Sequence, residues 1–157
     1  MGVLGTVISV FVIDRLGRRI LLLTSMSIMC VTICLLGMFF YLKELGQSDN
    51  LGWIPLVCLG LYTTAFALGI APVPWLMNGE LFAPEIKATG SGIATMTTWT
   101  LASVIIKTFP NLQEALGTHV TLWLFAGFAL AGVVFILFFV PETKGKSLVE
   151  IQKMLEE

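Results

Sequence analysis

Charged side chains are scarce in this sequence. Only 12% of its 157 residues are Asp, Glu, Lys or Arg, and the mean hydropathy is +0.93, whereas soluble domains carry roughly 25% charged residues. Such a composition favours a lipid bilayer over water as the partner of the chain, so we predict a multi-pass, all-α membrane protein. Nine Lys and Arg against ten Asp and Glu leave no excess of positive charge for binding phosphates, which argues against a nucleic-acid partner.

Residues that bind metals or perform catalysis are also few. The three cysteines, Cys30, Cys34 and Cys58, lie inside apolar runs, where thiols usually pack as small hydrophobic groups, so no metal site is predicted. The single histidine, His119, begins the last apolar run, and we interpret it as a loop-edge residue in contact with water. The apolar runs hold no catalytic triad or paired carboxylates, and no ATP-binding glycine loop occurs, so neither an enzyme nor a cofactor is expected.

Long apolar runs dominate the sequence instead. Four of them are long enough for the ~20 residues of a membrane-spanning helix, whereas the first is so short that we expect it to be the second half of a helix. Polar turn residues fill two connecting stretches, which are expected to be loops. The apolar runs cover residues 2–13 (partial), 20–42, 53–77, 89–108 and 119–140, and the loops cover 43–52 and 109–118.

The positive charges are distributed unevenly about these runs. Seven of the nine Lys and Arg flank one side, and the positive-inside rule places that side in the cytoplasm. The polar tail 141–157 is then cytoplasmic, and Ser147–Glu150 forms a capping box ahead of a short amphipathic helix. The seven residues are Arg15, Arg18, Arg19, Lys87, Lys144, Lys146 and Lys153.

Acidic residues accompany the cations on this side. Because arginine binds carboxylates through two parallel hydrogen bonds, these loops could form ion pairs that latch neighbouring helices in one conformation. The alternative is a solvated rim in which the arginines set topology and contact lipid headgroups. The residues concerned are Asp14, Arg15, Arg18 and Arg19 in a tight first loop, Glu80, Glu85 and Lys87 between the third and fourth runs, and Glu142 after the fifth.

Two prolines interrupt the third apolar run. In Gly69–Trp75, Pro72 and Pro74 remove backbone donors, so the helix should bend or break there. Irregular backbone at membrane depth is tolerated where it packs in protein or lines a wet cavity, which makes this stretch a candidate site wall. A purely structural kink is the alternative.

Tryptophans and hydroxyl groups occur near this break. Trp75 follows it, and Trp99 lies in the fourth run among Thr95, Thr97, Thr98, Thr100 and Ser103. Aromatic faces suit the C–H surface of a sugar ring and hydroxyls suit its OH groups, whereas a charged substrate would require a buried counter-charge. The alternatives are an interfacial tryptophan and ordinary packing of small polar residues.

Taken in order, five motifs resemble the second half of the sugar porter family of the major facilitator superfamily, and insect trehalose and hexose facilitators look similar. The match runs from the end of that family's eighth helix through its twelfth and into the tail. The resemblance implies twelve helices in two halves with a neutral sugar bound between them, and the N-terminal half has no counterpart here. The motifs are Asp14–Arg19, Gly69–Trp75, Gly79–Phe82, Trp99 and Pro141–Gly145.

The resemblance also implies roles for particular residues. Arg18, Arg19, Glu80, Lys87 and Glu142 would form a cytoplasmic ion-pair network, and Phe66, Trp75, Thr98 and Trp99 would line the sugar path. The sequence departs from the family pattern at Ala67, where many hexose carriers have an acidic residue, at Thr98, where Asn is common, and at Lys87, where the family usually has Arg.

We therefore expect residues 1–157 to be the C-terminal part of a transporter that carries a hexose or trehalose by facilitated, alternating access, in the plasma membrane and without a cofactor. Two alternatives stay open. One is a truncated, non-transporting membrane protein that acts as an assembly or regulatory partner. The other is a fragment with no independent role.

Overall fold

A computed structural model describes residues 17–46, 52–81 and 86–140, and apart from short turns all of these residues are helical. The predicted all-α class is confirmed for this part of the chain. The elements are α2 (Arg18–Glu44), α3 (Ile54–Ala65), the π-helix η1 (Phe66–Ile70), α4 (Val73–Leu81), α5 (Lys87–Leu116) and α6 (Thr118–Phe139).

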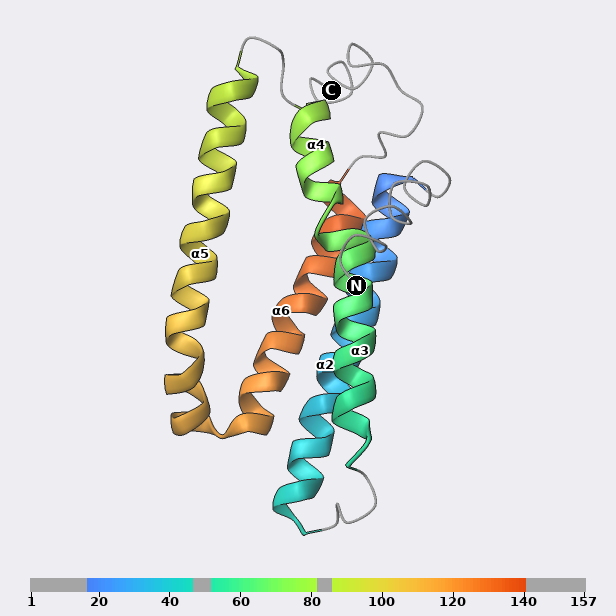
Figure 1. Cartoon of the computed structure of the whole chain (residues 1–157), viewed down its shortest axis with the longest axis vertical. Coiled ribbons are helices and arrows are strands. Elements are labelled where there is room, and N and C mark those ends of the chain that lie inside the picture. Colours follow the sequence, from blue (N-terminus) through green and yellow to red (C-terminus); the bar gives the residue numbers. More distant parts are fainter. Residues whose placement is uncertain (1–16, 47–51, 82–85, 141–157) are drawn as a thin grey trace.

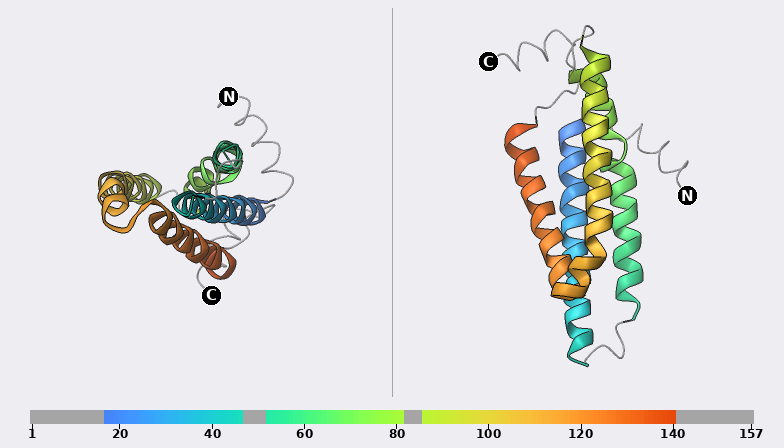
Figure 2. Two further views of the ribbon diagram at one scale, coloured as in Figure 1. Left: turned by 90° about the horizontal axis from the view of Figure 1, so that it is seen from below. Right: turned by 90° about the vertical axis from the view of Figure 1, so that its left-hand side faces the viewer.

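The helices form an elongated bundle with one member standing apart. Helix α2 packs along α6 on one side and along α3 and η1 on the other (Figure 1). Helix α5 contacts α6 near the turn that joins them and α4 towards the opposite end, and seen along the bundle it lies outside the other helices (Figure 2). None of its 30 residues is buried.

A small core holds one end of the bundle together. Leu21 and Leu22 from α2, Val73 and Met77 from α4 and Ile136 from α6 are buried in one cluster. Val73, directly after the helix break, is completely buried. This core therefore fixes α4 to α2 and α6, and with it the wall that follows the break.

Three segments of the described chain are long and apolar enough to cross a membrane. They are Arg18–Glu44, Ile54–Asn78 and Thr118–Phe139. We expected four membrane-spanning helices. Helix α5 does not meet the criterion, because its Thr, Ser and Gly residues and Lys107 make it less apolar than the other three segments. Its length of 30 residues corresponds to about 45 Å of rise.

The expected loop at 109–118 is wrong. Helix α5 continues through Phe109 and the polar residues after it to Leu116, and only Gly117 separates it from α6. Gly117 has φ +84, a backbone conformation that glycine adopts at little cost, so one residue suffices for the turn. The loop was expected because polar residues end the apolar run here. A helix that leaves the hydrocarbon layer can, however, continue into water with polar side chains.

The third apolar run is divided into three pieces. Helix α3 ends at Ala65, a π-helix follows, and Ala71 and Pro72 form a turn before α4 begins. The Ala71 amide donates to the Phe66 carbonyl at 2.9 Å, five residues back rather than four. Prolines at 72 and 74 cannot donate backbone hydrogen bonds, which is the physical reason for an irregular segment here.

Gly69 lies where η1 approaches α2 most tightly. A Cβ added there would lie 1.9 Å from the Ser25 Oγ, 2.6 Å from the Ser25 Cβ and 3.0 Å from the Leu21 carbonyl oxygen. Only glycine allows the two backbones to come this close. The irregular segment can thus pack closely against α2 because Gly69 has no side chain.

Candidate functional site

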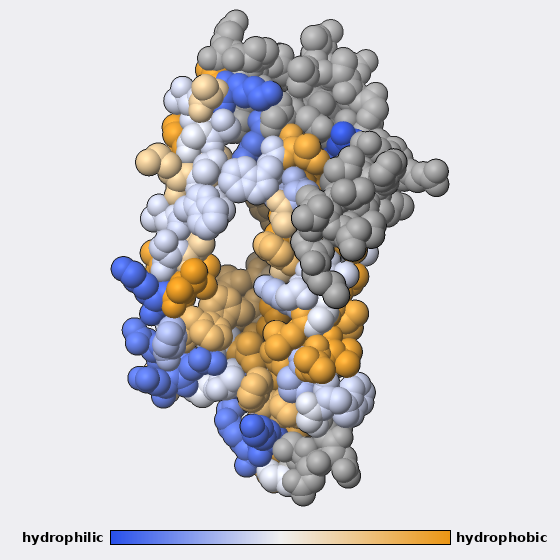
Figure 3. All heavy atoms as spheres, viewed as in Figure 1, coloured by the Kyte–Doolittle hydropathy of each residue, from blue (hydrophilic) through white to orange (hydrophobic). Residues whose placement is uncertain are grey.

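A cavity of about 440 Å³ lies beside the helix break, between η1 and α4 on one side and α5 on the other. In the space-filling view, α5 is separated from the other helices by an opening in the upper half of the molecule (Figure 3). The lining residues are Phe66, Ile70, Ala71, Pro74, Trp75, Asn78, Thr98, Trp99 and Ala102.

The structure brings the four residues predicted for the sugar path to this one cavity. Phe66 begins the π-helix, Trp75 stands on α4, and Thr98 and Trp99 are neighbours on α5. Trp75 and Trp99 are half or more exposed within the described chain, so both indoles are accessible. Residues 33 positions apart in sequence, Phe66 and Trp99, therefore share a wall that no local pattern could reveal.

The three residues predicted at the helix break have different positions. Gly69 faces α2, Pro72 lies in the turn, and Pro74 lines the cavity. The break thus contributes to two surfaces, since Gly69 packs against α2 while Pro74 and Trp75, after the turn, line the cavity.

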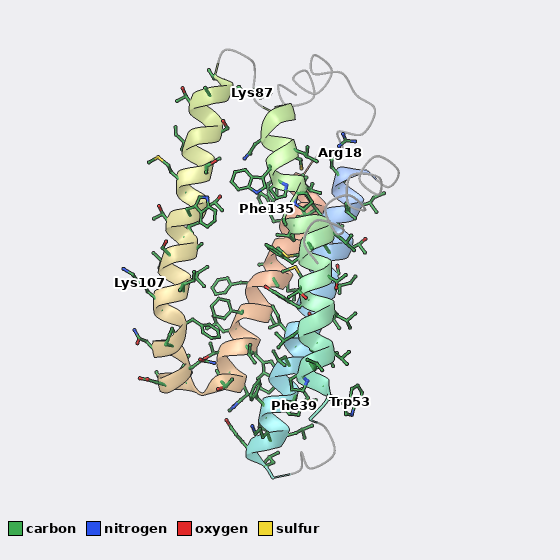
Figure 4. All side chains as sticks on the ribbon, in the orientation of Figure 1. Arg18, Phe39, Trp53, Lys87, Lys107 and Phe135 are labelled. Carbon is green, nitrogen blue, oxygen red and sulfur yellow. The ribbon has the colours of Figure 1, made fainter. Side chains whose placement is uncertain are left out.

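Among the described residues, no charged side chain lines this cavity. The nearest cation along α5, Lys107, is exposed and points away from the other helices (Figure 4). Aromatic faces together with an amide and a hydroxyl suit a neutral ligand that has both C–H and O–H surface, because a charged ligand in such a site would lack a counter-charge.

The hydroxyls of α5 are largely engaged by their own helix. The Thr98 Oγ1 donates to the Ala94 carbonyl at 2.8 Å, and Thr95, Thr97 and Ser103 make the same bond to the carbonyl four residues back. This is the usual way in which Ser and Thr satisfy themselves inside a helix. Thr98 can therefore accept a hydrogen bond from a ligand, but its proton is already committed.

Asn78 is a lining residue that the sequence analysis missed. It lies in α4 three residues after Trp75 and four after Pro74, so it falls on the same helix face as both. That spacing was visible in the sequence and is the signal that could have found it. Pro74, Ile70, Ala71 and Ala102 complete the wall with apolar surface.

Three of the five basic residues in the described part of the chain, Arg18, Arg19 and Lys87, lie at one end of the bundle. Arg18 and Lys87 lie at the start of α2 and of α5, the two helices that begin at this end (Figure 4). Glu80 belongs to α4, which ends here, but its side chain is not among the described ones. Asp14, Arg15 and Glu142 lie outside the described residues, so the ion pairs expected among these groups stay a prediction.

Arg19 has a contact that the sequence analysis did not anticipate. Its Nη2 donates to the Leu137 carbonyl near the end of α6. In a continuing helix the residue four positions later would bond that carbonyl, but Pro141 has no N–H to donate. Arg19 therefore satisfies a carbonyl that the sequence leaves without a helical donor, and its charge suits the negative end of the α6 dipole.

His119 is not the water-exposed residue we expected. Its Nδ1 lies 3.0 Å from the Glu44 Oε2, with 18% of its side chain exposed against 55% for Glu44. Its ring centroid is 5.5 Å from that of Tyr41 and 5.7 Å from that of Trp123. The interpretation failed because Tyr41 and Glu44 come from the far end of α2, which packs along α6 only in the folded bundle.

A second cavity, of about 290 Å³, lies between α2, α3, α5 and α6. Its wall is almost entirely aliphatic and aromatic, with Thr32 and Tyr62 as the hydroxyl-bearing residues. The Thr32 hydroxyl donates to the Met29 carbonyl at 2.9 Å. This cavity suits hydrocarbon and offers little to a polar ligand.

Three apolar helical segments of membrane length, with a tryptophan-lined cavity between helices, are the features of a multi-pass membrane protein. The chain belongs to the sugar (and other) transporter family, whose sequence profile matches residues 1–155. The resemblance predicted from the five motifs is thereby confirmed, as is the expectation that the family's activity is transport and not enzymatic.

Individual relatives agree with this assignment. The chain is 46% identical to the facilitated trehalose transporter Tret1 of Bombyx mori over 154 residues, 97% of this chain and 30% of that protein. It is 40% identical to Tret1 of Aedes aegypti over 153 residues, 97% of this chain and 19% of that protein. The chain thus spans less than a third of the length of these relatives.

Solved structures show the same arrangement of helices. The inward-open xylose transporter XylE from E. coli superposes with a TM-score of 0.85 at 27% identity, covering 98% of this chain and 33% of XylE. XylE, a proton:xylose symporter of the major facilitator superfamily, bound to 6-bromo-6-deoxy-D-glucose, superposes with a TM-score of 0.81 at 28% identity, covering 98% of this chain and 32% of that structure.

Proposed function

We propose that this chain forms one wall of the sugar path in a facilitative carrier and works together with further helices of a longer transporter. The observation that carries the proposal is the cavity in which Trp75 and Trp99 meet Phe66, Thr98 and Asn78, with no charged side chain among its described lining residues. The substrate class is a neutral sugar, a hexose or trehalose.

The chemistry of the cavity supports a sugar. Two indoles and a phenyl ring offer flat apolar surface for the C–H faces of a pyranose, while the Asn78 amide and the Thr98 hydroxyl offer hydrogen bonds. Hydrogen bonds to uncharged groups contribute only about 1 kcal/mol each. Such a site binds weakly enough to release its ligand on either side of the membrane, as a facilitative carrier requires.

Helix α5 indicates where the remainder of the carrier belongs. It carries the cavity residues Thr98 and Trp99, yet none of its side chains is buried among the described residues. We place the N-terminal half of the transporter against this helix, with α5 as a fourth membrane span whose hydroxyl-rich surface faces protein and the sugar path rather than lipid. Alternating access would then move the two halves about the cavity.

The basic end of the bundle is assigned to the cytoplasm of a plasma-membrane protein. Arg18, Arg19 and Lys87 lie at this end, and the positive-inside rule favours that side for short basic loops. The C-terminal tail is then cytoplasmic. Ion pairs of Arg15, Arg18, Arg19 and Lys87 with Asp14, Glu80 and Glu142 would close the carrier on this side when it opens outwards.

A chimera tests the function directly. This chain replaces the matching 30% of Bombyx mori Tret1, and uptake of labelled trehalose and glucose is measured in cells that express the chimera at their surface. We expect saturable uptake that needs no ion gradient, and its loss when Trp75 and Trp99 are both changed to alanine. The matched control is Trp53→Ala, because Trp53 is exposed and lies outside the cavity.

The chain without its partner helices provides the second arm. Reconstituted alone in vesicles, it should show no uptake above the background of empty vesicles. A chimera that reaches the surface at the level of Tret1 yet carries neither sugar would contradict the proposal. Uptake that survives the double alanine replacement would equally contradict it, because the cavity would then not be the sugar path.

A further inference from the structure

We infer that Asn78 contacts the sugar and determines which of its hydroxyl groups the carrier requires. The inference rests on the proposed function and goes beyond it, since it names the residue that gives selectivity. Asn78 lines the cavity, is half-buried, and shares a helix face with Trp75.

The other lining residues offer limited hydrogen bonding. Phe66, Ile70, Ala71, Pro74 and Ala102 have no polar side-chain atoms, and the two tryptophans can only donate. Thr98 has given its proton to the Ala94 carbonyl. Each group other than Asn78 can therefore act in one direction only, as a donor or as an acceptor.

The Asn78 amide is different because it donates and accepts at once. Its side chain makes no hydrogen bond to another described residue, so both functions are available to a ligand. A half-buried amide without a protein partner loses free energy unless water or a ligand satisfies it. We therefore expect the Asn78 amide to form hydrogen bonds with water when the cavity holds no sugar and with the sugar when the sugar is bound.

Sugar chemistry matches this pair of functions. Each hydroxyl of a pyranose donates and accepts, and two neighbouring hydroxyls can engage the carbonyl oxygen and the NH₂ of one amide together. With the sugar ring stacked against an indole, such a bidentate contact depends on the orientation of two adjacent hydroxyls. A sugar that lacks one of these hydroxyls would leave either the carbonyl oxygen or the NH₂ of the amide without a hydrogen bond. Recognition of this kind discriminates more strongly than apolar contact does.

The test compares Asn78→Leu with Asn111→Leu in the chimera described above. Both changes replace an amide by an aliphatic group of similar size, but Asn111 is exposed on α5 and does not line the cavity. We expect Asn78→Leu to raise KM about tenfold, the effect of losing one or two hydrogen bonds, with surface expression unchanged. Asn111→Leu should leave KM within about twofold of the parent value.

A series of monodeoxy sugars distinguishes contact from mere packing. With Asn78 present, removing the contacted hydroxyl should weaken uptake, whereas the other positions matter less. In Asn78→Leu that particular penalty should disappear, because the hydroxyl has lost its partner. Asn78→Asp keeps the shape and the acceptor but replaces the donor by a negatively charged oxygen, so it should retain only part of the discrimination. It guards against a leucine variant that misfolds.

The two failures are distinguishable. If the chimera with Asn78 in place carries no sugar, the proposed function fails. If that chimera transports normally and Asn78→Leu leaves KM unchanged, or weakens all deoxy sugars in the same proportion as the unmodified one, Asn78 does not read a hydroxyl and the inference is overturned.

Discussion

A methyl group at position 69 should force the π-helix away from α2. In Gly69→Ala the new Cβ would lie 2.6 Å from the Ser25 Cβ and 3.0 Å from the Leu21 carbonyl oxygen. The Ser25 hydroxyl can rotate away, but its Cβ and the Leu21 carbonyl are fixed to the α2 backbone. Because carbon atoms pack at about 3.5–4.0 Å, the two segments must separate by about 1 Å.

The expected destabilisation is about 2–3 kcal/mol. Overpacking a tight contact typically costs about 1–3 kcal/mol, and here the displaced partner is backbone on one side and a buried serine on the other. Alanine regains up to about 1 kcal/mol as a better helix former than glycine, which is smaller than the clash. The separation would also push Phe66 and Ile70 towards the cavity.

Equilibrium unfolding of the purified chain in mixed micelles of mild and denaturing detergent measures this change. The matched controls are Gly60→Ala in α3 and Gly127→Ala in α6, where an added Cβ meets nothing within 4 Å. Both should be neutral or slightly stabilising. Adding Ser25→Gly to Gly69→Ala removes the two closest contacts and should restore most of the lost stability.

Two results would refute the reasoning. If Gly69→Ala unfolds at the same denaturant fraction as Gly60→Ala, the approach of η1 to α2 is not as tight as described. If Ser25→Gly gives no rescue, the loss of stability has a cause other than this clash.

Three further predictions concern single side chains. Trp99→Ala in the chimera should raise KM more than about tenfold, Trp99→Phe less, and Trp53→Ala not at all, since a large aromatic contact is lost only at the cavity. Thr98→Val should change KM less than about threefold, because the Thr98 hydroxyl already donates its hydrogen bond to the Ala94 carbonyl of the same helix. A tenfold change in KM would mean that the hydroxyl donates to the sugar instead. A double-mutant cycle of His119→Ala and Glu44→Gln, measured by unfolding in detergent, should give a coupling energy of about 0.5 kcal/mol. The coupling is small because the Glu44 side chain is about half exposed. A coupling energy of zero would show that the pair does not form.

The sequence predicted the helical class, the membrane character and the place of the break, because each depends on local chemistry. Run length and hydropathy decide whether a segment can span lipid, and Pro72 and Pro74 lack donors in any context. The four cavity residues were named from the resemblance to the sugar porter family, and the structure brings them together. Their role in binding sugar stays a prediction.

What the sequence did not predict depends on contacts between distant segments. The partnership of His119 with Glu44 requires α2 and α6 to lie side by side, and nothing in either segment alone indicates it. The end of α5 was placed too early, because loss of apolar character was taken for loss of helix. Asn78 was overlooked because a single amide directly after an apolar run indicates no site until its neighbours across the cavity are known.

The conformation of the π-helix decides which way the cavity-lining residues of α4 face. A π-turn closes over five residues where an α-turn closes over four, so η1 holds one residue more than a regular helix would use. The π-turn therefore absorbs the extra residue without turning the helix that follows, whereas an extra residue in regular α-turns would rotate all that follows by about 100°. If the same residues closed as α-turns, Trp75 and Asn78 would turn away from the cavity together, so the orientation of both depends on the π-turn upstream of them.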